Sequence, residues 1–164
     1  MKNKANPISR RKFLAVSGAI AGTTIVNPAS NILATNMGSN SMNNKKTRLA
    51  IVGLGIRGTS MWGSSLTKDY ADNVEFVGLC DHNPGRLALG KQLIGTDCPT
   101  FDDFEQMMRE TKPDQLIVTT DDDTHDHFIV KGMEMGADII CEKPMAIDEQ
   151  KIQRIIDAEK RTGK

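Results

Sequence analysis

A glycine-rich loop is the first group of residues in this chain whose types and spacing could do chemistry. Gly53-Leu54-Gly55-Ile56-Arg57-Gly58 follows the apolar run from Arg48 to Val52 and precedes an amphipathic stretch. In that setting the first glycine allows a tight turn, the second lets a pyrophosphate approach the backbone, and the third lets helix and strand pack closely. The N–H groups and positive dipole at the helix start would bind the phosphates. The loop therefore predicts a dinucleotide site, with a methyltransferase loop and a glycine-rich turn without a ligand as alternatives.

An acidic residue, Asp81, follows the next apolar run, Val74 to Cys80. A carboxylate at the end of this strand can accept hydrogen bonds from both ribose hydroxyls of the adenosine half of a dinucleotide, and it would repel a 2′-phosphate. NAD is therefore favoured over NADP. The 28 positions from Gly53 to Asp81 exceed the usual ~20, because Tyr70 to Asn73 lengthens the connection. Arg86 could instead partner a phosphate or stack on adenine, and a surface carboxylate without a ligand is the alternative for Asp81.

Polar residues also follow the third apolar run, which ends at Thr119. Thr119 and Thr120 precede three aspartates, Thr124 and His125. Ligands of parallel sheets bind beyond the carboxyl ends of the strands, so Thr119, Thr120 and His125 are candidate cofactor contacts. The aspartates suit the start of a helix, and capping alone would explain them. His125 and His127 beside these acids could suggest a metal site, but no third cluster of ligands occurs in the sequence, so no metal is predicted.

A charged tripeptide, Glu142-Lys143-Pro144, follows the fourth apolar run, Ile139-Ile140-Cys141. A lysine at a strand end, after an acid and before a rigid proline, would lie where a substrate meets the nicotinamide of a bound cofactor. Its ammonium can hydrogen-bond a sugar hydroxyl and stabilise alkoxide character as hydride leaves. Lys143 is therefore the candidate catalytic residue, although the tripeptide alone favours a solvated loop lysine.

Four strands and five helices are expected to position these residues. The strands are expected at 48–52, 74–80, 115–119 and 138–141. The helices are expected at 57–67, 84–94, 101–111, 124–135 and 148–161, with Asn83 as an N-cap and Pro84 in a first turn. Apolar strands that alternate with amphipathic helices are typical of βαβ units. Right-handed crossovers then give a Rossmann-type doubly wound parallel sheet of the α/β class.

The chain resembles the Gfo/Idh/MocA family, named for glucose–fructose oxidoreductase and inositol dehydrogenase. The resemblance rests on four features in order: the glycine loop, Asp81, the residues from Thr120 to His125, and Glu142-Lys143-Pro144. The resemblance covers residues 48–164, and its most specific part is Glu142-Lys143-Pro144. It implies that Lys143 is the catalytic-site lysine and that Glu142 helps to hold it and the nicotinamide side. The family pattern has a proline where this chain has Asp121, so the local turn and the cofactor contacts differ there.

The resemblance also completes the list of expected contacts and implies a second domain. That domain is mostly antiparallel α/β, and it supplies the catalytic His or Asp and most substrate contacts. Since a strand would be expected after the helix terminator Gly163, we expect the sequence to be truncated before it. The residues expected to bind the cofactor are Gly53, Gly55, Ile56, Arg57, Gly58, Asp81, Arg86, Thr119, Thr120, His125, Glu142 and Lys143.

Charge is distributed unevenly along the chain. Residues 1–48 contain no acidic residue, and the first acid is Asp69. From Leu49 onward 13 Lys and Arg stand against 21 Asp and Glu, so the formal charge of zero combines a basic leader with an acidic body. An acidic body argues against nucleic acid as a partner, because nucleic acid needs a basic surface. Cys80, Cys98 and Cys141 are odd in number and lack metal-ligand spacing, so no disulfide framework is expected.

The basic leader has the features of an export signal. Ser9-Arg10-Arg11-Lys12-Phe13-Leu14 precedes a weakly apolar run, Ala15 to Val26, and adjacent arginines there are read by the twin-arginine export route. The run is too short and too polar for a stable membrane span. We expect a twin-arginine signal peptide at 1–34, a linker at 35–46 and the nucleotide-binding domain at 47–164 of an exported, periplasmic protein. A Sec signal, or a basic start without function, is the alternative.

Three functions are compatible with these features. The leading one is the N-terminal part of an exported NAD-dependent oxidoreductase that transfers hydride between a sugar, cyclitol or related polyol and NAD, and that forms a homo-oligomer when full length. The second is a glycosidase of the same family that retains NAD and works by transient oxidation and elimination. The third is a dinucleotide-binding module without catalysis. The fragment alone is expected to be inactive.

Overall fold

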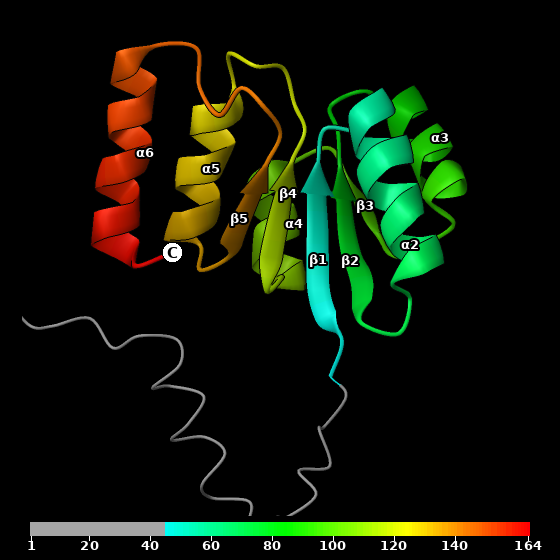
Figure 1. The fold of residues 1–164 in the computed structure, drawn as a ribbon. Helices are drawn as coiled ribbons and strands as arrows, with labels where there is room; N and C mark the ends of the chain where they lie inside the picture. The colour runs from blue at the N-terminus through cyan, green and yellow to red at the C-terminus, as the bar shows by residue number, and fades with distance from the viewer. Residues whose placement is uncertain (1–44) are drawn as a thin grey trace, which may run out of the picture. The chain divides into compact units, whose positions relative to one another are not determined.

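The computed structural model of this chain describes residues 45–164. The expected signal peptide and nearly all of the expected linker therefore lie outside the described residues. Five parallel strands form one sheet in the order β3-β2-β1-β4-β5 (Figure 1). The strands are β1 (Thr47–Val52), β2 (Val74–Cys80), β3 (Thr100–Phe101), β4 (Gln115–Val118) and β5 (Asp138–Cys141).

Helices cover both faces of this sheet. They are the π-helix η1 (Arg57–Ser64), α2 (Ser65–Asp69), α3 (Pro84–Ile94), α4 (Phe104–Thr111), α5 (His125–Glu134) and α6 (Glu149–Thr162). Figure 1 shows α2 and α3 at the side of β2 and β3, and α6 packed outside α5. Within residues 45–164, no helix is long and apolar enough to cross a membrane.

Alternate residues of the central strands pack into two separate cores. On one face, Ala50 and Val52 of β1 join residues of α4, α5 and α6. On the other face, Leu49 and Ile51 of the same strand join residues of η1, α2 and α3. Side chains of a strand point alternately to opposite faces, so one strand fills both cores. The Rossmann-type doubly wound parallel sheet predicted from the sequence is confirmed.

Two of the expected elements differ from the structure. The expected helix at 57–67 begins as a π-helix and becomes α-helical only at Ser65. In its first turn the hydroxyls of Thr59 and Ser60 donate to the carbonyl oxygens four residues earlier, at 2.8 and 2.5 Å. Such bonds compete with regular helical hydrogen bonding. π-Turns of this kind are frequent at functional sites.

The expected helix at 101–111 was wrong at its start. Phe101 is buried in the short strand β3, where it pairs with Cys80. The helix begins at Phe104, because the carboxylate of Asp103 accepts a hydrogen bond from the backbone N–H of Gln106 at 2.6 Å and caps it. The N-cap predicted at Asn83 is confirmed, since its side chain accepts bonds from the N–H groups of Gly85 and Arg86.

The three cysteines are free thiols. Cys80 and Cys98 are buried, and Cys141 is partly buried. Burial raises the pKa of the Cys80 thiol to about 12, and the nearby Asp81 carboxylate acts in the same direction. Burial likewise raises the pKa of Cys141 to about 11 and raises that of Cys98.

Candidate functional site

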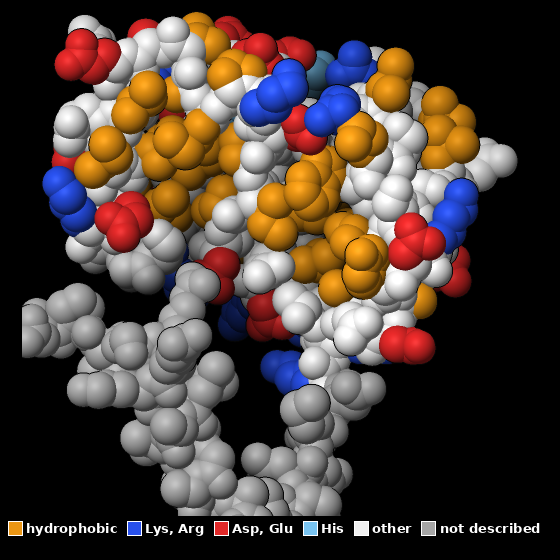
Figure 2. Space-filling view, in the orientation of Figure 1, with side chains coloured by type: hydrophobic (Ala, Val, Ile, Leu, Met, Phe, Trp, Pro, Cys, Tyr) orange, Lys and Arg blue, Asp and Glu red, His pale blue; other side chains and the backbone are white. Residues whose placement is uncertain are grey.

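The candidate site lies at the carboxyl ends of the parallel strands, the upper edge of the sheet in Figure 1. Charged side chains of both signs gather along the same edge in Figure 2. A cavity of about 300 Å³ opens there between β1, β2 and β4. Predicted residues that line it are Gly53, Gly55, Asp81, Arg86, Thr119 and Thr120. The topology therefore brings together residues that lie up to 67 positions apart in the sequence.

The glycine loop has the geometry that its sequence pattern requires. Gly53 has φ of +91°, and a Cβ there would lie 2.6 Å from the backbone carbonyl of Thr119. A Cβ at Gly58 would collide with the carbonyl oxygen of Gly53, because the helix start packs directly on the loop. At Gly55, by contrast, a Cβ would meet nothing within 4 Å. The loop is thus closed toward the sheet and open at the position expected to face the pyrophosphate.

Asp81 is buried and already holds two backbone groups. One carboxylate oxygen accepts a hydrogen bond from the N–H of Leu54 at 2.8 Å, and the other accepts from the N–H of Asn83 at 2.9 Å. The side chain thus ties the glycine loop to the end of β2. Each oxygen retains a second acceptor site, so the predicted ribose contacts are still available. The guanidinium of Arg86 lies 3.9 Å away, beyond hydrogen-bond distance.

A second cavity, of about 280 Å³, adjoins the first through two shared residues, Thr119 and Thr120. The hydroxyl of Thr119 is buried and donates to the carbonyl of Gly53 at 2.6 Å, so this threonine fastens β4 to the glycine loop. The remaining residues that line the second cavity are Arg57, Asp122, His125, Glu142 and Lys143. The structure therefore places the candidate catalytic lysine beside the dinucleotide cavity.

Glu142 is the centre of a hydrogen-bond network in the second cavity. Its two carboxylate oxygens accept from the Arg57 guanidinium at 2.7 and 2.9 Å. One of them also accepts from the Trp62 indole N–H at 3.0 Å, and the other from the backbone N–H of Lys143 at 3.3 Å. Hydrogen bonds from Arg57 and then from Trp62 hold the pKa of the Glu142 carboxyl below its usual value of 4.5. Glu142 is thus held as an anion.

Lys143 presents its side chain to solvent next to this network. Its ammonium forms no ion pair among residues 45–164. The adjacent acid does not hold it, because the oxygens of Glu142 accept bonds from other groups. The cation is therefore open to solvent at the edge of the second cavity.

His125 is buried, although it contributes to the wall of the second cavity. Its ring is 1% exposed. Nδ1 lies 2.8 Å from the carbonyl oxygen of Pro144, and Nε2 lies 3.0 Å from the carbonyl oxygen of Thr120. A neutral ring can donate to only one of these acceptors. The histidine thus links the start of α5 to the segment that follows Lys143, and a hydrogen bond to the cofactor would require one of these contacts to open.

Neither Asp121 to Asp123 nor the histidines form a cluster of three metal-ligating groups within residues 45–164. The backbone carbonyl of Asp121 accepts from the N–H and the hydroxyl of Thr124, as in the local turn before a helix. The arrangement of these acids is that of a helix start.

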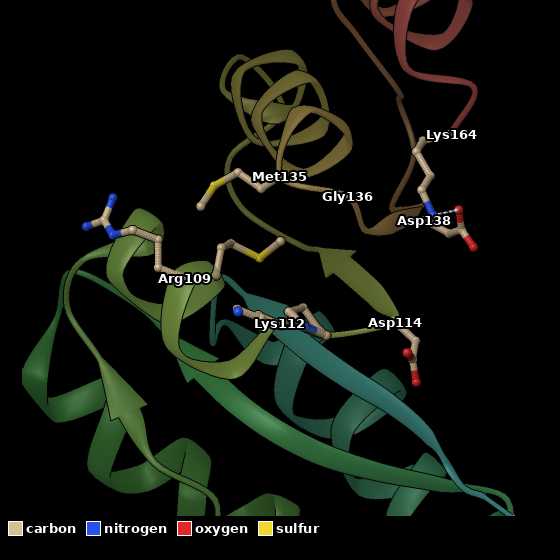
Figure 3. Close-up of a pocket in the computed structure, with 9 residues that line it drawn as sticks. Arg109, Lys112, Asp114, Met135, Gly136, Asp138 and Lys164 are labelled. Atoms are coloured by element: carbon tan, nitrogen blue, oxygen red, sulfur yellow. Dashed lines mark ion pairs between the residues drawn. The ribbon is translucent and has the colours of Figure 1, made fainter.

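A larger cavity, of about 580 Å³, lies at the opposite edge of the sheet (Figure 3). It is formed by the residues that precede β4 and β5, including Lys112 and Asp114. Several of its charged groups already have partners within the protein: Lys164 lies 3.2 Å from Asp138, and the Asp114 carboxylate accepts from the N–H of Arg48 at 2.9 Å. Because ligands of such sheets bind at the carboxyl ends of strands, we assign the site to the two smaller cavities.

Trp62 is the member of this site that the sequence did not reveal. It lies on η1, 80 positions before the carboxylate that it contacts. Its apolar ring also packs against the core on that side of the sheet. The one available signal was its position, five residues after Arg57 in the helix that the glycine loop opens, but nothing in the sequence identifies its partner.

Comparisons with known proteins identify a family and several similar proteins. Residues 47–164 match the sequence model of Gfo/Idh/MocA, described as an oxidoreductase family with an NAD-binding Rossmann fold. The chain is 29% identical over 118 residues to inositol 2-dehydrogenase/D-chiro-inositol 3-dehydrogenase of Lactiplantibacillus plantarum, covering 72% of this chain and 33% of the relative. It is 31% identical over 127 residues to glycosyl hydrolase family 109 protein 1 of Akkermansia muciniphila, covering 73% and 26%.

A solved structure gives a similar result. The WlbA dehydrogenase of Chromobacterium violaceum, crystallised with NADH and UDP-GlcNAcA, superposes with a TM-score of 0.68 at 25% identity, covering 74% of this chain and 34% of that protein. The chain spans about a third or less of the length of the curated relatives that it matches.

Proposed function

Because this chain belongs to the Gfo/Idh/MocA oxidoreductase family, with its NAD-binding Rossmann fold, we propose that it is the nucleotide-binding part of an NAD-dependent oxidoreductase acting on a CH–OH group of a sugar, cyclitol or related polyol. The NAD-binding domain expected from the sequence is confirmed by the family match. The choice of substrate rests on the relatives, which include an inositol dehydrogenase and a dehydrogenase crystallised with a UDP-sugar.

One observation carries the cofactor half of this proposal. The glycine loop is open at Gly55, and Asp81 lines the same cavity at the end of the neighbouring strand. The free N–H groups of the helix start suit a pyrophosphate, and the spare acceptor sites of Asp81 suit the ribose hydroxyls. A 2′-phosphate would be repelled by this carboxylate, so NAD is favoured over NADP.

The residues of the second cavity suit the substrate half. A bound NAD would supply the hydride acceptor or donor for the substrate carbon. The chain itself supplies Lys143, whose ammonium can hydrogen-bond the substrate hydroxyl and stabilise negative charge on its oxygen. Glu142 and His125 hold the backbone on either side of this lysine, through the N–H of Lys143 and the carbonyl of Pro144.

Calorimetric titration of the chain with NADH and with NADPH tests the cofactor assignment. We expect tighter binding of NADH, and we expect Asp81→Ser to narrow the difference, because serine removes both the carboxylate acceptors and the repulsion. Equal affinities of the unaltered chain for the two cofactors would contradict the role given to Asp81. Residues 47–164 alone are expected to bind dinucleotide weakly and without turnover, since the second domain is expected to supply the catalytic His or Asp.

A second candidate function has a specific observation in its favour. The similarity to a glycosyl hydrolase family 109 protein covers 73% of this chain. A glycosidase of this kind would oxidise its substrate transiently, eliminate the glycoside and return the hydride, so NAD would not be consumed. Incubation of the full-length protein with sugar glycosides separates the two functions, because glycan release without net reduction of NAD would support the glycosidase.

The leader residues supply a proposal about location. The adjacent Arg10 and Arg11 and the mild apolar run that follows favour export through the twin-arginine route to the periplasm. Since that route carries folded proteins, the domain would acquire its fold, and its cofactor, before export. We further propose that the full-length protein forms a homo-oligomer.

A further inference from the structure

We infer that Arg57, although it belongs to the glycine loop, acts as a positioning residue that keeps Glu142 from capturing the ammonium of Lys143. The inference rests on the proposed function, because it concerns the lysine assigned to the substrate. The sequence predicts a direct contact between Arg57 and the cofactor. In the inferred role, Arg57 acts indirectly: it binds Glu142 and thereby leaves the ammonium of Lys143 unpaired in the second cavity.

The geometry of Arg57 points to this role. Its guanidinium extends from the first turn of η1 to the loop after β5 and contacts both oxygens of Glu142. The guanidinium also contacts the sulfur of Met61, one turn further along the same helix. Arg57 accordingly lines the second cavity and is not among the residues that line the first.

Glu142 and Lys143 would otherwise be natural partners. They are adjacent in the sequence, both line the cavity of about 280 Å³, and the Glu142 side chain already folds back to the N–H of Lys143. The carboxylate is 12% exposed, so an unpaired charge there would be costly. Without Arg57, the exposed ammonium of Lys143, which lines the same cavity, becomes available to neutralise it. A lysine held in this way could not stabilise a substrate oxygen.

Trp62 also holds Glu142 in place, from the side of the apolar core. Its indole N–H fixes the carboxylate in the position that Arg57 neutralises, at 3.0 Å. The hydrogen bonds from Arg57 and Trp62 that lower the pKa of Glu142 also keep it charged above mildly acidic pH. The pairing of Arg57 with Glu142 is therefore maintained at neutral pH.

Competitive amine labelling of the 164-residue chain tests the inference without NAD or turnover. Trace acetylation by acetic anhydride at pH 8 is quantified by mass spectrometry as the ratio of Lys143 to the exposed Lys68, which forms no ion pair among residues 45–164. An ammonium held by a carboxylate gives up its proton less readily and labels more slowly. We expect Arg57→Met to lower the ratio about threefold, the size expected for one partly exposed ion pair.

A second substitution distinguishes capture of Lys143 by Glu142 from a general disturbance of the site by the loss of Arg57. In the double variant Arg57→Met with Glu142→Gln, the carboxylate is gone, so labelling of Lys143 should return to within about 1.5-fold of the unaltered chain. The matched control is Arg161→Ala, which breaks an exposed Arg–Glu pair of similar length, 2.6 Å to Glu134, away from the site. The control should leave the ratio unchanged.

Two results would overturn the inference. One is an unchanged Lys143 ratio in Arg57→Met, and the other is a double variant that labels as slowly as Arg57→Met. If the proposed oxidoreductase function is correct as well, Arg57→Met should lower kcat with little change in the KM for NAD. The labelling ratios could change as expected although the full-length protein shows no dehydrogenase activity. That result would support the role of Arg57 in pairing with Glu142 and would reject the proposed oxidoreductase function.

Discussion

Replacing Asp81 by Asn should destabilise the fold even before a cofactor is considered. The carboxylate accepts one backbone N–H with each oxygen, from Leu54 and from Asn83. An amide has the same shape but a single acceptor oxygen, and its NH₂ group would face one of the two N–H donors. A buried donor left without a partner costs about 1–3 kcal/mol. At roughly 4 °C per kcal/mol for a domain of this size, the melting temperature should fall by about 4 to 12 °C.

The assay is urea unfolding followed by circular dichroism, with the slope m compared between variants so that stability alone is measured. Asp72→Asn is the matched control, because Asp72 is exposed in the turn before β2, and we expect it to lie within about 0.5 kcal/mol of the unaltered chain. Asp81→Ala should be less stable than Asp81→Asn, since it removes both acceptors. If Asp81→Asn and Asp72→Asn unfold at the same urea concentration, Asp81 does not hold the loop as described.

Three further predictions concern other parts of the chain. If the full-length protein has the proposed activity, Lys143→Ala should lower its turnover about 10²-fold or more with NAD affinity nearly unchanged, and Lys143→Arg should rescue little; steady-state kinetics would disprove this if turnover stayed near normal. Because the pKa of Glu142 is lowered on folding, it stabilises the fold above its unfolded pKa of about 4.5 and loses this effect as pH falls through the folded value. Unfolding at pH 3 and 7 should therefore show that Glu142→Gln costs stability at pH 7 and little at pH 3, whereas an equal cost at both would contradict the pairing. Changing Arg10 and Arg11 together to Lys should keep the protein in the cytoplasm on fractionation, and continued export would favour the Sec route.

Local patterns made most of the fold predictable. The alternation of apolar runs and amphipathic stretches placed four of the five strands, and Asn83-Pro84 placed the start of α3. The two-residue strand β3 was missed, because two residues show no periodicity. The pattern around Phe101 is also compatible with the start of a helix. The π-turns of η1 were missed for a related reason, since they depend on hydroxyl bonds and packing that the apolar pattern does not encode.

The candidate site was predictable in its members but not in their contacts. The roles of Gly53 and Gly58 were predictable from the sequence alone, because their constraints are local to a strand–loop–helix unit. The pairing of Arg57 with Glu142 joins residues 85 positions apart, and either side chain could equally have faced the cofactor. His125 was expected beside the cofactor, but its ring is buried because two backbone carbonyls flank it. The roles in binding and catalysis given to these residues stay predictions.

The protonated thiols bear on the chemical durability of the protein in an oxidising environment. The thiolate is the form that oxidants and disulfides attack, and with a pKa of about 12 at Cys80 and about 11 at Cys141, very little thiolate exists at neutral pH. Exposure to air or to a disulfide-forming compartment should therefore leave both sulfurs unchanged. The thiol of Cys80, which lies beside Asp81 at the wall of the first cavity, should therefore stay reduced there.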